Sequence, residues 1–104
     1  MTKFTVSAIA SQRLDEIFAY TRDNWGVEEA EVYIRGLFGC FDQIGRQQIV
    51  GRAISAEFGM EGYYHRHERH YVYWRRLSDQ CVGIVTILHG RLHQTDRFRG
   101  DAEN

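Results

Sequence analysis

The spacing of apolar residues changes once along the chain, close to Gly62, and this change limits the folds that the chain can adopt. Before it, large apolar residues recur every three or four positions, which is typical of amphipathic helices. After it, Tyr, Val, Ile and Trp follow a period of two, which is typical of half-buried strands. A chain of 104 residues with this order predicts a single α+β domain in which helices cover one face of a sheet.

The first part of the chain predicts a short strand and two helices. Phe4 and Val6 form the strand, and Ser7 is a residue type that caps helix N-termini. The first helix is expected to reach about Asn24 and to end at Trp25-Gly26. The second helix starts at once, with acidic residues in its first turns, and ends at Gly45.

Two helices joined so closely form an antiparallel hairpin. Gly36 and Gly39 lie inside the second helix, where glycine costs about 1 kcal/mol relative to alanine. We expect them to let the two helix backbones approach closely. Several aromatic residues are expected in the core between helices and sheet: Tyr33, Phe38, Phe41, Tyr71, Tyr73 and Trp74.

The second part predicts a three-stranded antiparallel meander. After a connection over 46–62, the strands are expected at Tyr63–His67, His70–Arg76 and Cys81–Leu88. The tail over 91–104 is expected to form at most a short helix and then to be disordered, with little effect of its deletion on folding. The predicted order is therefore β-α-α-β-β-β, a helical hairpin packed on a small antiparallel sheet.

Charge is unevenly distributed although the formal net charge is -1. From Met1 to Glu61, six basic and nine acidic residues give -3, whereas from Gly62 to Arg99 seven arginines and three acids give +4. No apolar run is long enough to span a membrane and no secretory signal precedes the domain, so a cytoplasmic location is expected. Cys40 and Cys81 are expected to be reduced and largely buried.

The chain resembles the ParE toxins of the ParE/RelE toxin-antitoxin superfamily in several segments that occur in the same order. These segments are Ile17-Phe18-Ala19-Tyr20, Trp25-Gly26, Ala30 and Tyr33, Gly51-Arg52, Arg69-His70-Tyr71-Val72-Tyr73-Trp74 and Ile87-Leu88-His89-Gly90-Arg91. The chain departs from the family pattern at Thr86, where Arg is common, at His93, where Asp is common, and in having no proline. The resemblance implies a small cytosolic toxin that inhibits DNA gyrase and is held inactive by a ParD-like antitoxin.

The charge distribution suggests where such partners bind. We expect acidic antitoxin residues to contact four arginines of the basic half, with two helix residues completing the contact: Arg66, Arg69, Arg75 and Arg91, with Leu37 and Phe41. We expect the target to contact the cationic tail, at Arg91, His93, Arg97 and Arg99. Neither a cofactor nor sequence-specific binding of nucleic acid is expected.

Two other kinds of site remain open. A RelE-like ribosome-dependent mRNA endonuclease would need clustered cations and a general acid or base, for which the candidates are Arg66, Arg75, Arg91, His89 and His93. A single lysine and a net acidic helix pair argue against it, so no catalytic residue is expected. His65 and His67, with His89 and His93, could approach a metal, but no cysteine or carboxylate lies at ligand spacing, and structural roles are favoured.

Overall fold

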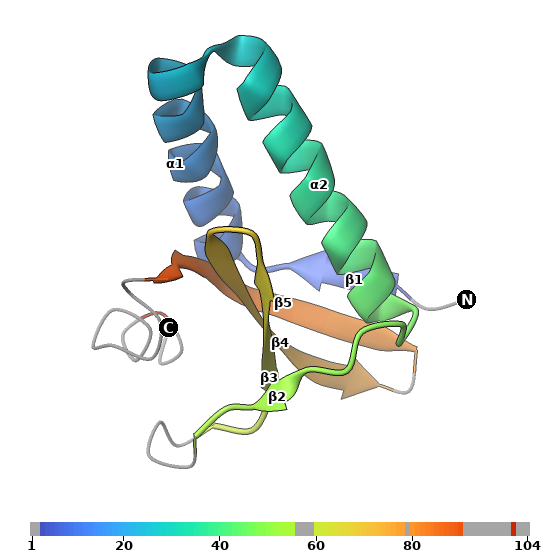
Figure 1. The fold of residues 1–104 in the computed structure, drawn as a ribbon. Helices are drawn as coiled ribbons and strands as arrows, with labels where there is room; N and C mark the ends of the chain where they lie inside the picture. Colours follow the sequence, from blue (N-terminus) through green and yellow to red (C-terminus); the bar gives the residue numbers. More distant parts are fainter. Residues whose placement is uncertain (1–2, 56–59, 79, 91–100, 102–104) are drawn as a thin grey trace.

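The computed structural model describes residues 3–55, 60–78, 80–90 and 101. Two helices and five strands occur in these residues, and both helices lie on one side of the sheet (Figure 1). The elements are β1 (Lys3–Val6), α1 (Ala8–Trp25), α2 (Val27–Gly45), β2 (Arg52–Ala53), β3 (Tyr63–His67), β4 (His70–Ser78) and β5 (Cys81–His89). This arrangement confirms the predicted α+β fold with a helical hairpin on one face of a sheet.

The helix boundaries follow from local chemistry. The Ser7 Oγ accepts a hydrogen bond from the Ala10 N–H at 3.0 Å and so caps α1. Gly26 has a φ of +96°, which glycine adopts without strain, and its N–H binds the Arg22 carbonyl to end the helix. Glu28 and Glu29 occupy the first turn of α2. The predicted helices are confirmed to within a residue or two.

The role predicted for the two helix glycines is wrong. A Cβ built on Gly36 would lie 3.3 Å from the His67 imidazole, which belongs to β3 rather than to α1. A Cβ built on Gly39 would meet nothing within 4 Å. Gly36 therefore makes room for the tip of the β3–β4 hairpin, and close packing of the two helices explains neither glycine.

The sheet is larger than predicted and is mixed. Its order is β1-β5-β4-β3-β2, and β1 pairs with β5 in parallel, with Phe4 opposite Val82. The expected three-stranded antiparallel meander forms the centre of this sheet. The expected connection over 46–62 contains β2, a two-residue strand that pairs with β3. The pairing of β1 with β5 joins opposite ends of the sequence, and no local pattern encodes it.

The helices and the sheet enclose the main core. α1 and α2 contribute Leu14, Ile17, Leu37 and Phe41, which pack with Val72, Trp74, Val82, Ile84 and Ile87 from the sheet. Of the six aromatic residues predicted to be buried, Phe41, Tyr73 and Trp74 are buried, and Tyr33 and Tyr71 are half-buried. Phe38 is 41% exposed and corrects the prediction for that position. It packs instead against the rings of Phe4 and Phe41 at the surface.

Both cysteines are free. Cys40 is buried, and burial raises the pKa of its thiol to about 11, whereas Cys81 is only half-buried. In the residues that the structure describes, no helix has the length and apolar character needed to cross a membrane.

The predicted tail over 91–104 lies outside the described residues except at Asp101. Asp101 is described, and its side chain is buried. The expectation that the tail contributes little to folding therefore needs correction at this position, as its contacts below explain.

Candidate functional site

The candidate site is the face of the sheet opposite the helices, which we call the outer face. Residues paired across neighbouring strands point to the same face, so the strand register arranges the side chains in rows. One row holds Arg52, Tyr64 and Tyr73, and the next holds Arg66, Tyr71 and Leu88. Alternation along β4 places Arg75 on this face too. Arg52 and Arg66 therefore lie at one end of their rows, each next to a tyrosine of the neighbouring strand.

The arginines of the sheet differ from those of the helices in their partners. Each arginine of the two helices, and Arg46 at the C-cap of α2, lies within hydrogen-bond distance of a carboxylate. The four pairs are Arg13–Asp101, Arg22–Asp23, Arg35–Glu31 and Arg46–Asp42. Within the described residues, no ion pair is made by Arg52, Arg66, Arg69, Arg75 or Arg76. Uncompensated guanidinium groups raise the local positive potential, which favours anionic partners.

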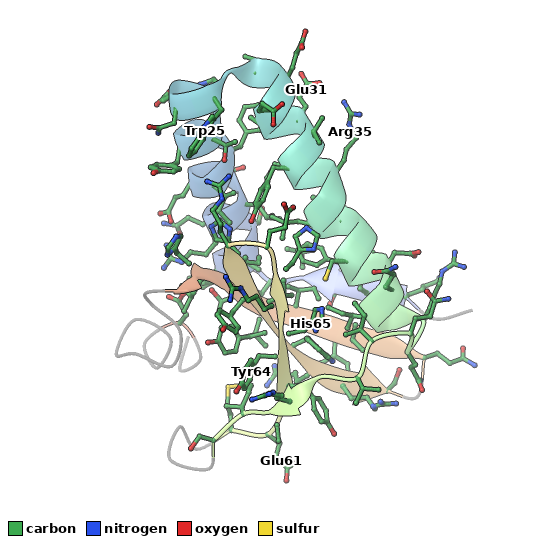
Figure 2. The ribbon with its side chains drawn as sticks, viewed as in Figure 1. Trp25, Glu31, Arg35, Glu61, Tyr64 and His65 are labelled. Carbon is green, nitrogen blue, oxygen red and sulfur yellow. The ribbon has the colours of Figure 1, made fainter. Side chains whose placement is uncertain are left out.

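The predicted antitoxin-binding arginines do not form one cluster. Arg66 lies on the outer face, where its Nε donates to the Glu68 carbonyl at 2.7 Å. Arg75 lines a cavity of about 220 Å³ with Leu77 and Val85. Arg69 lies at the hairpin tip, with its guanidinium 4.6 Å from the ring centroid of Trp25, which Figure 2 labels at the end of α1. Arg91 lies outside the described residues.

The prediction that Leu37 and Phe41 contact an antitoxin is wrong for the chain folded in this way. Both side chains have 0% exposure and belong to the core between α2 and the sheet. The helical periodicity that singled them out marks the face of α2 that packs against β-strands. Only Phe38, one position from Leu37, presents an aromatic ring from this part of α2 to solvent.

The histidines of β3, β4 and β5 form a row on the helix side of the sheet. His70 pairs with His67 on one side and with His89 on the other. The Tyr33 hydroxyl and His70 Nδ1 share a hydrogen bond at 2.6 Å. Burial, aided by the positive charges of neighbouring His89 and Arg69, lowers the pKa of His70 to about 4. His70 is therefore neutral at physiological pH and joins the hairpin to α2.

The structure supports neither a metal site nor a nuclease site that brings its candidate histidine and arginines together. No group of three His, Cys, Asp or Glu side chains in the described part of the chain is placed to hold a metal. His89 lies in the histidine row on the helix side, whereas Arg66 and Arg75 lie on the outer face. The sheet thus separates the general acid or base candidate from the cations, and His93 and Arg91 lie outside the described residues.

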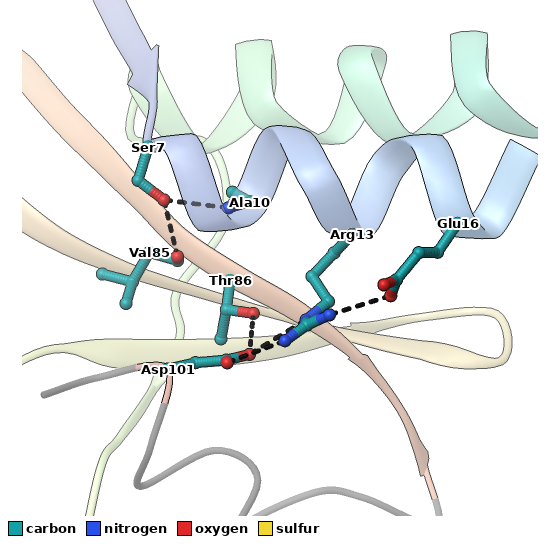
Figure 3. A network of polar contacts seen from close by, with 7 residues as sticks. All are labelled: Ser7, Ala10, Arg13, Glu16, Val85, Thr86 and Asp101. Atoms are coloured by element: carbon teal, nitrogen blue, oxygen red, sulfur yellow. Dashed lines mark hydrogen bonds and ion pairs between the residues drawn. The ribbon is translucent and has the colours of Figure 1, made fainter. Parts of the chain in front are cut away.

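A buried polar network that the sequence analysis missed joins α1, β5 and Asp101 (Figure 3). Arg13 donates to both Asp101 oxygens, from Nε at 3.0 Å and from a terminal nitrogen at 2.8 Å. The Thr86 hydroxyl donates to the same carboxylate at 2.9 Å, and Glu16 accepts from Arg13. The hydrogen bonds with Asp101 raise the pKa of Arg13 despite its burial.

The network had only one signal in the sequence. Thr86 departs from the Arg that is common in ParE-like chains, and it is a fully buried member of this network. Arg13 falls among the polar positions of α1, and Asp101 lies 88 residues away in a polar tail. Neither position has a hydrophobic pattern that predicts burial. Arg52 was likewise missed as a site residue, because β2 is too short to show a period.

Comparison with known proteins places this architecture. The family described as "ParE toxin of type II toxin-antitoxin system, parDE" matches residues 4–92. The chain belongs to this ParE toxin family. It is 29% identical over 92 residues to proteins named Toxin ParE1 from two Mycobacterium tuberculosis strains, CDC 1551 / Oshkosh and H37Rv, covering 88% of this chain and 92% of each relative.

A solved structure shares the fold of this ParE family member. The structure is titled "Chromosomal ParDE TA system from P. aeruginosa", and the superposition has a TM-score of 0.70 at 16% identity. It covers 86% of this chain and 96% of the other. At this identity the comparison concerns the fold alone, and it agrees with two helices packed on a mixed five-stranded sheet.

Proposed function

We propose that this ParE family member is a toxin that acts in the cytoplasm by binding DNA gyrase rather than by catalysis. The observation that carries the proposal is the family match over residues 4–92, which covers both helices of the hairpin, β2 to β5 and β1 from Phe4 onward. The separation of His89 from the outer-face arginines also favours a binding activity over nuclease chemistry. The cationic tail residues Arg91, His93, Arg97 and Arg99 remain the proposed target contact.

A ParD-like antitoxin is the proposed natural partner. A disordered antitoxin segment that folds on the toxin would gain affinity from acidic side chains placed opposite Arg66 and Arg75. Neither of these two arginines makes an ion pair within the described residues, so an incoming carboxylate need not displace a described acidic side chain. Neutralisation would follow from covering the toxin surface.

Purified components test the proposed target. The full-length chain is added to DNA gyrase in supercoiling and DNA-cleavage assays, and to a translating ribosome programmed with a defined mRNA. We expect loss of supercoiling or increased gyrase-mediated cleavage, with the mRNA intact. Unchanged gyrase activity together with ribosome-dependent mRNA cleavage would replace this proposal with a RelE-like nuclease.

A further inference from the structure

The outer face contains a cavity of about 410 Å³ at its β2 edge. The cavity is lined by Val50, Arg52, Tyr64, His65, Arg66 and Tyr71. Figure 2 labels Tyr64 and His65 on the part of β3 that lies next to β2. Cavities that bind small molecules usually enclose about 300 to 1,000 Å³, so this one has room for a ligand much larger than one carboxylate.

The positive groups of the cavity are arranged around an aromatic ring. Arg52 is the cross-strand partner of Tyr64, and Arg66 follows Tyr64 by two residues on the same face of β3. Diagonal neighbours of this kind have Cα atoms about 7 to 8 Å apart. Arg52 and Arg66 are therefore both neighbours of Tyr64 on the outer face, within reach of one ligand.

Both guanidinium groups retain unused hydrogen-bond donors. The Arg52 side chain makes no hydrogen bond or ion pair within the described residues. Arg66 uses its Nε on the Glu68 carbonyl, and this bond fixes the orientation of the guanidinium. None of the six lining residues is acidic. The cavity thus offers two guanidinium groups, each with paired N–H donors whose spacing matches that of phosphate oxygens.

The floor of the cavity is aromatic and is held in place. The Tyr64 ring lies 5.9 Å from the Tyr71 ring and 5.7 Å from the Tyr73 ring, measured between centroids. Tyr73 is completely buried, so this aromatic cluster is anchored in the sheet. Aromatic rings held beside arginines provide a stacking surface for nucleobases. Among the described residues, Val50 alone contributes an aliphatic side chain to the lining, so these residues offer little contact to an apolar side chain of a peptide.

We propose that this cavity binds a nucleotide, with its phosphate held by Arg52 and Arg66 and its base against Tyr64 and Tyr71. An acidic side chain of a protein would pair with one guanidinium and leave most of the cavity unfilled. A nucleotide can contact both guanidinium groups with its phosphate and the aromatic floor with its base. The activity is binding without cleavage, and it stands apart from the proposed action on gyrase.

Titration of the full-length chain with AMP, UMP, adenosine and inorganic phosphate tests the proposal. We expect each mononucleotide to bind at least about ten-fold more tightly than phosphate or adenosine, because it contacts both the arginines and the tyrosines of the cavity. Arg52→Ala should weaken AMP binding about ten-fold. Arg52→Lys should restore only part of it, because an ammonium lacks these paired donors. Tyr64→Leu should weaken AMP binding but not the weak binding of phosphate.

Matched controls separate the cavity from general charge. Arg35→Ala removes an exposed arginine of α2 that pairs with Glu31, away from Tyr64 and His65 (Figure 2), and should leave AMP binding unchanged. Thermal melting shows whether each variant is folded. If Tyr64→Leu does not fold, the effect of Arg52→Ala on AMP binding decides the test. The proposal is overturned by absence of nucleotide binding, by equal affinity for phosphate and AMP, or by equal effects of Arg52→Ala and Arg35→Ala. Tighter binding of an acidic aromatic peptide that depends on Arg52 and Tyr64, and not on Arg66 alone, also overturns it and assigns the cavity to a protein partner.

Discussion

Arg13 and Asp101 show how much a single pair of residues can add to this small fold. Both side chains are buried, and two hydrogen bonds join them across 88 residues of sequence. A buried pair is weak evidence for net stabilisation, because both charges lose their hydration. Loss of one partner destabilises the folded chain, since it leaves the other charge buried without compensation.

Asp101→Ala should therefore lower the free energy of unfolding by about 3 kcal/mol, and deletion after Leu92 should do at least the same. Urea denaturation of each variant measures the change. Asp23→Ala is the control, because its pair with Arg22 is exposed and should change stability by less than about 1 kcal/mol. Equal stability of Asp101→Ala and the wild-type chain would show that water replaces the carboxylate without penalty.

His70 predicts a fall in stability on acidification. Its pKa is about 4 in the folded chain, below the ordinary 6.5, so the unfolded chain binds the proton more tightly. The stabilisation is fully present above pH 6.5 and is lost as the pH falls toward 4. With allowance for partial exposure, the loss between pH 7 and pH 5 should be about 1 to 2 kcal/mol.

Urea unfolding at pH 7 and pH 5 tests this assignment. His70→Gln keeps a polar group beside the Tyr33 hydroxyl but does not titrate. The variant should lose less stability than the wild-type chain between the two pH values. An identical pH dependence in both chains would assign the effect to other groups.

At the scale of elements, the sequence predicted well wherever the determining forces are local. The Ser7 cap, the Gly26 stop and the alternation in β3 to β5 each depend on neighbours in sequence, and the structure confirms them. The parallel pairing of β1 with β5 and the burial of Asp101 depend on contacts across the whole chain. For the site, composition indicated the basic half, but only the strand register shows which arginines share a face.

The two glycines of α2 offer a test of element packing. Gly39→Ala should raise the free energy of unfolding by about 0.5 to 1 kcal/mol, because the methyl group meets nothing within 4 Å and alanine favours the helix. Gly36→Ala should give a smaller gain or a loss, since its methyl group would lie 3.3 Å from His67. Chemical denaturation of both variants measures which substitution raises the free energy of unfolding more. A larger gain at position 36 would contradict the packing of the hairpin against α2.

The tail offers a test that avoids disturbing the fold. Arg97→Ala combined with Arg99→Ala keeps Asp101, so the buried network is retained. If the tail contacts the target, this double variant should inhibit gyrase at least several-fold less while antitoxin affinity is unchanged. Full inhibition by the variant would move the target contact elsewhere on the molecule.

At the scale of the whole molecule, the distribution of charge partners separates two surfaces. The helical hairpin carries arginines that are already paired with acids, and within the described residues the sheet carries arginines that are not. Anionic partners should therefore be drawn to the sheet side of this toxin. We propose that two of these arginines, Arg66 and Arg75, recognise the partner that neutralises the toxin.

The dissociation constant of a ParD-like antitoxin, measured over a range of salt concentrations, tests that claim most directly. Each of Arg66→Ala and Arg75→Ala should remove an interaction worth about 1 to 3 kcal/mol, raising the dissociation constant about 5- to 150-fold and flattening its salt dependence. Arg35→Ala, on the paired helix surface, should change neither quantity. Unchanged affinity and salt dependence in both sheet variants would contradict the claim.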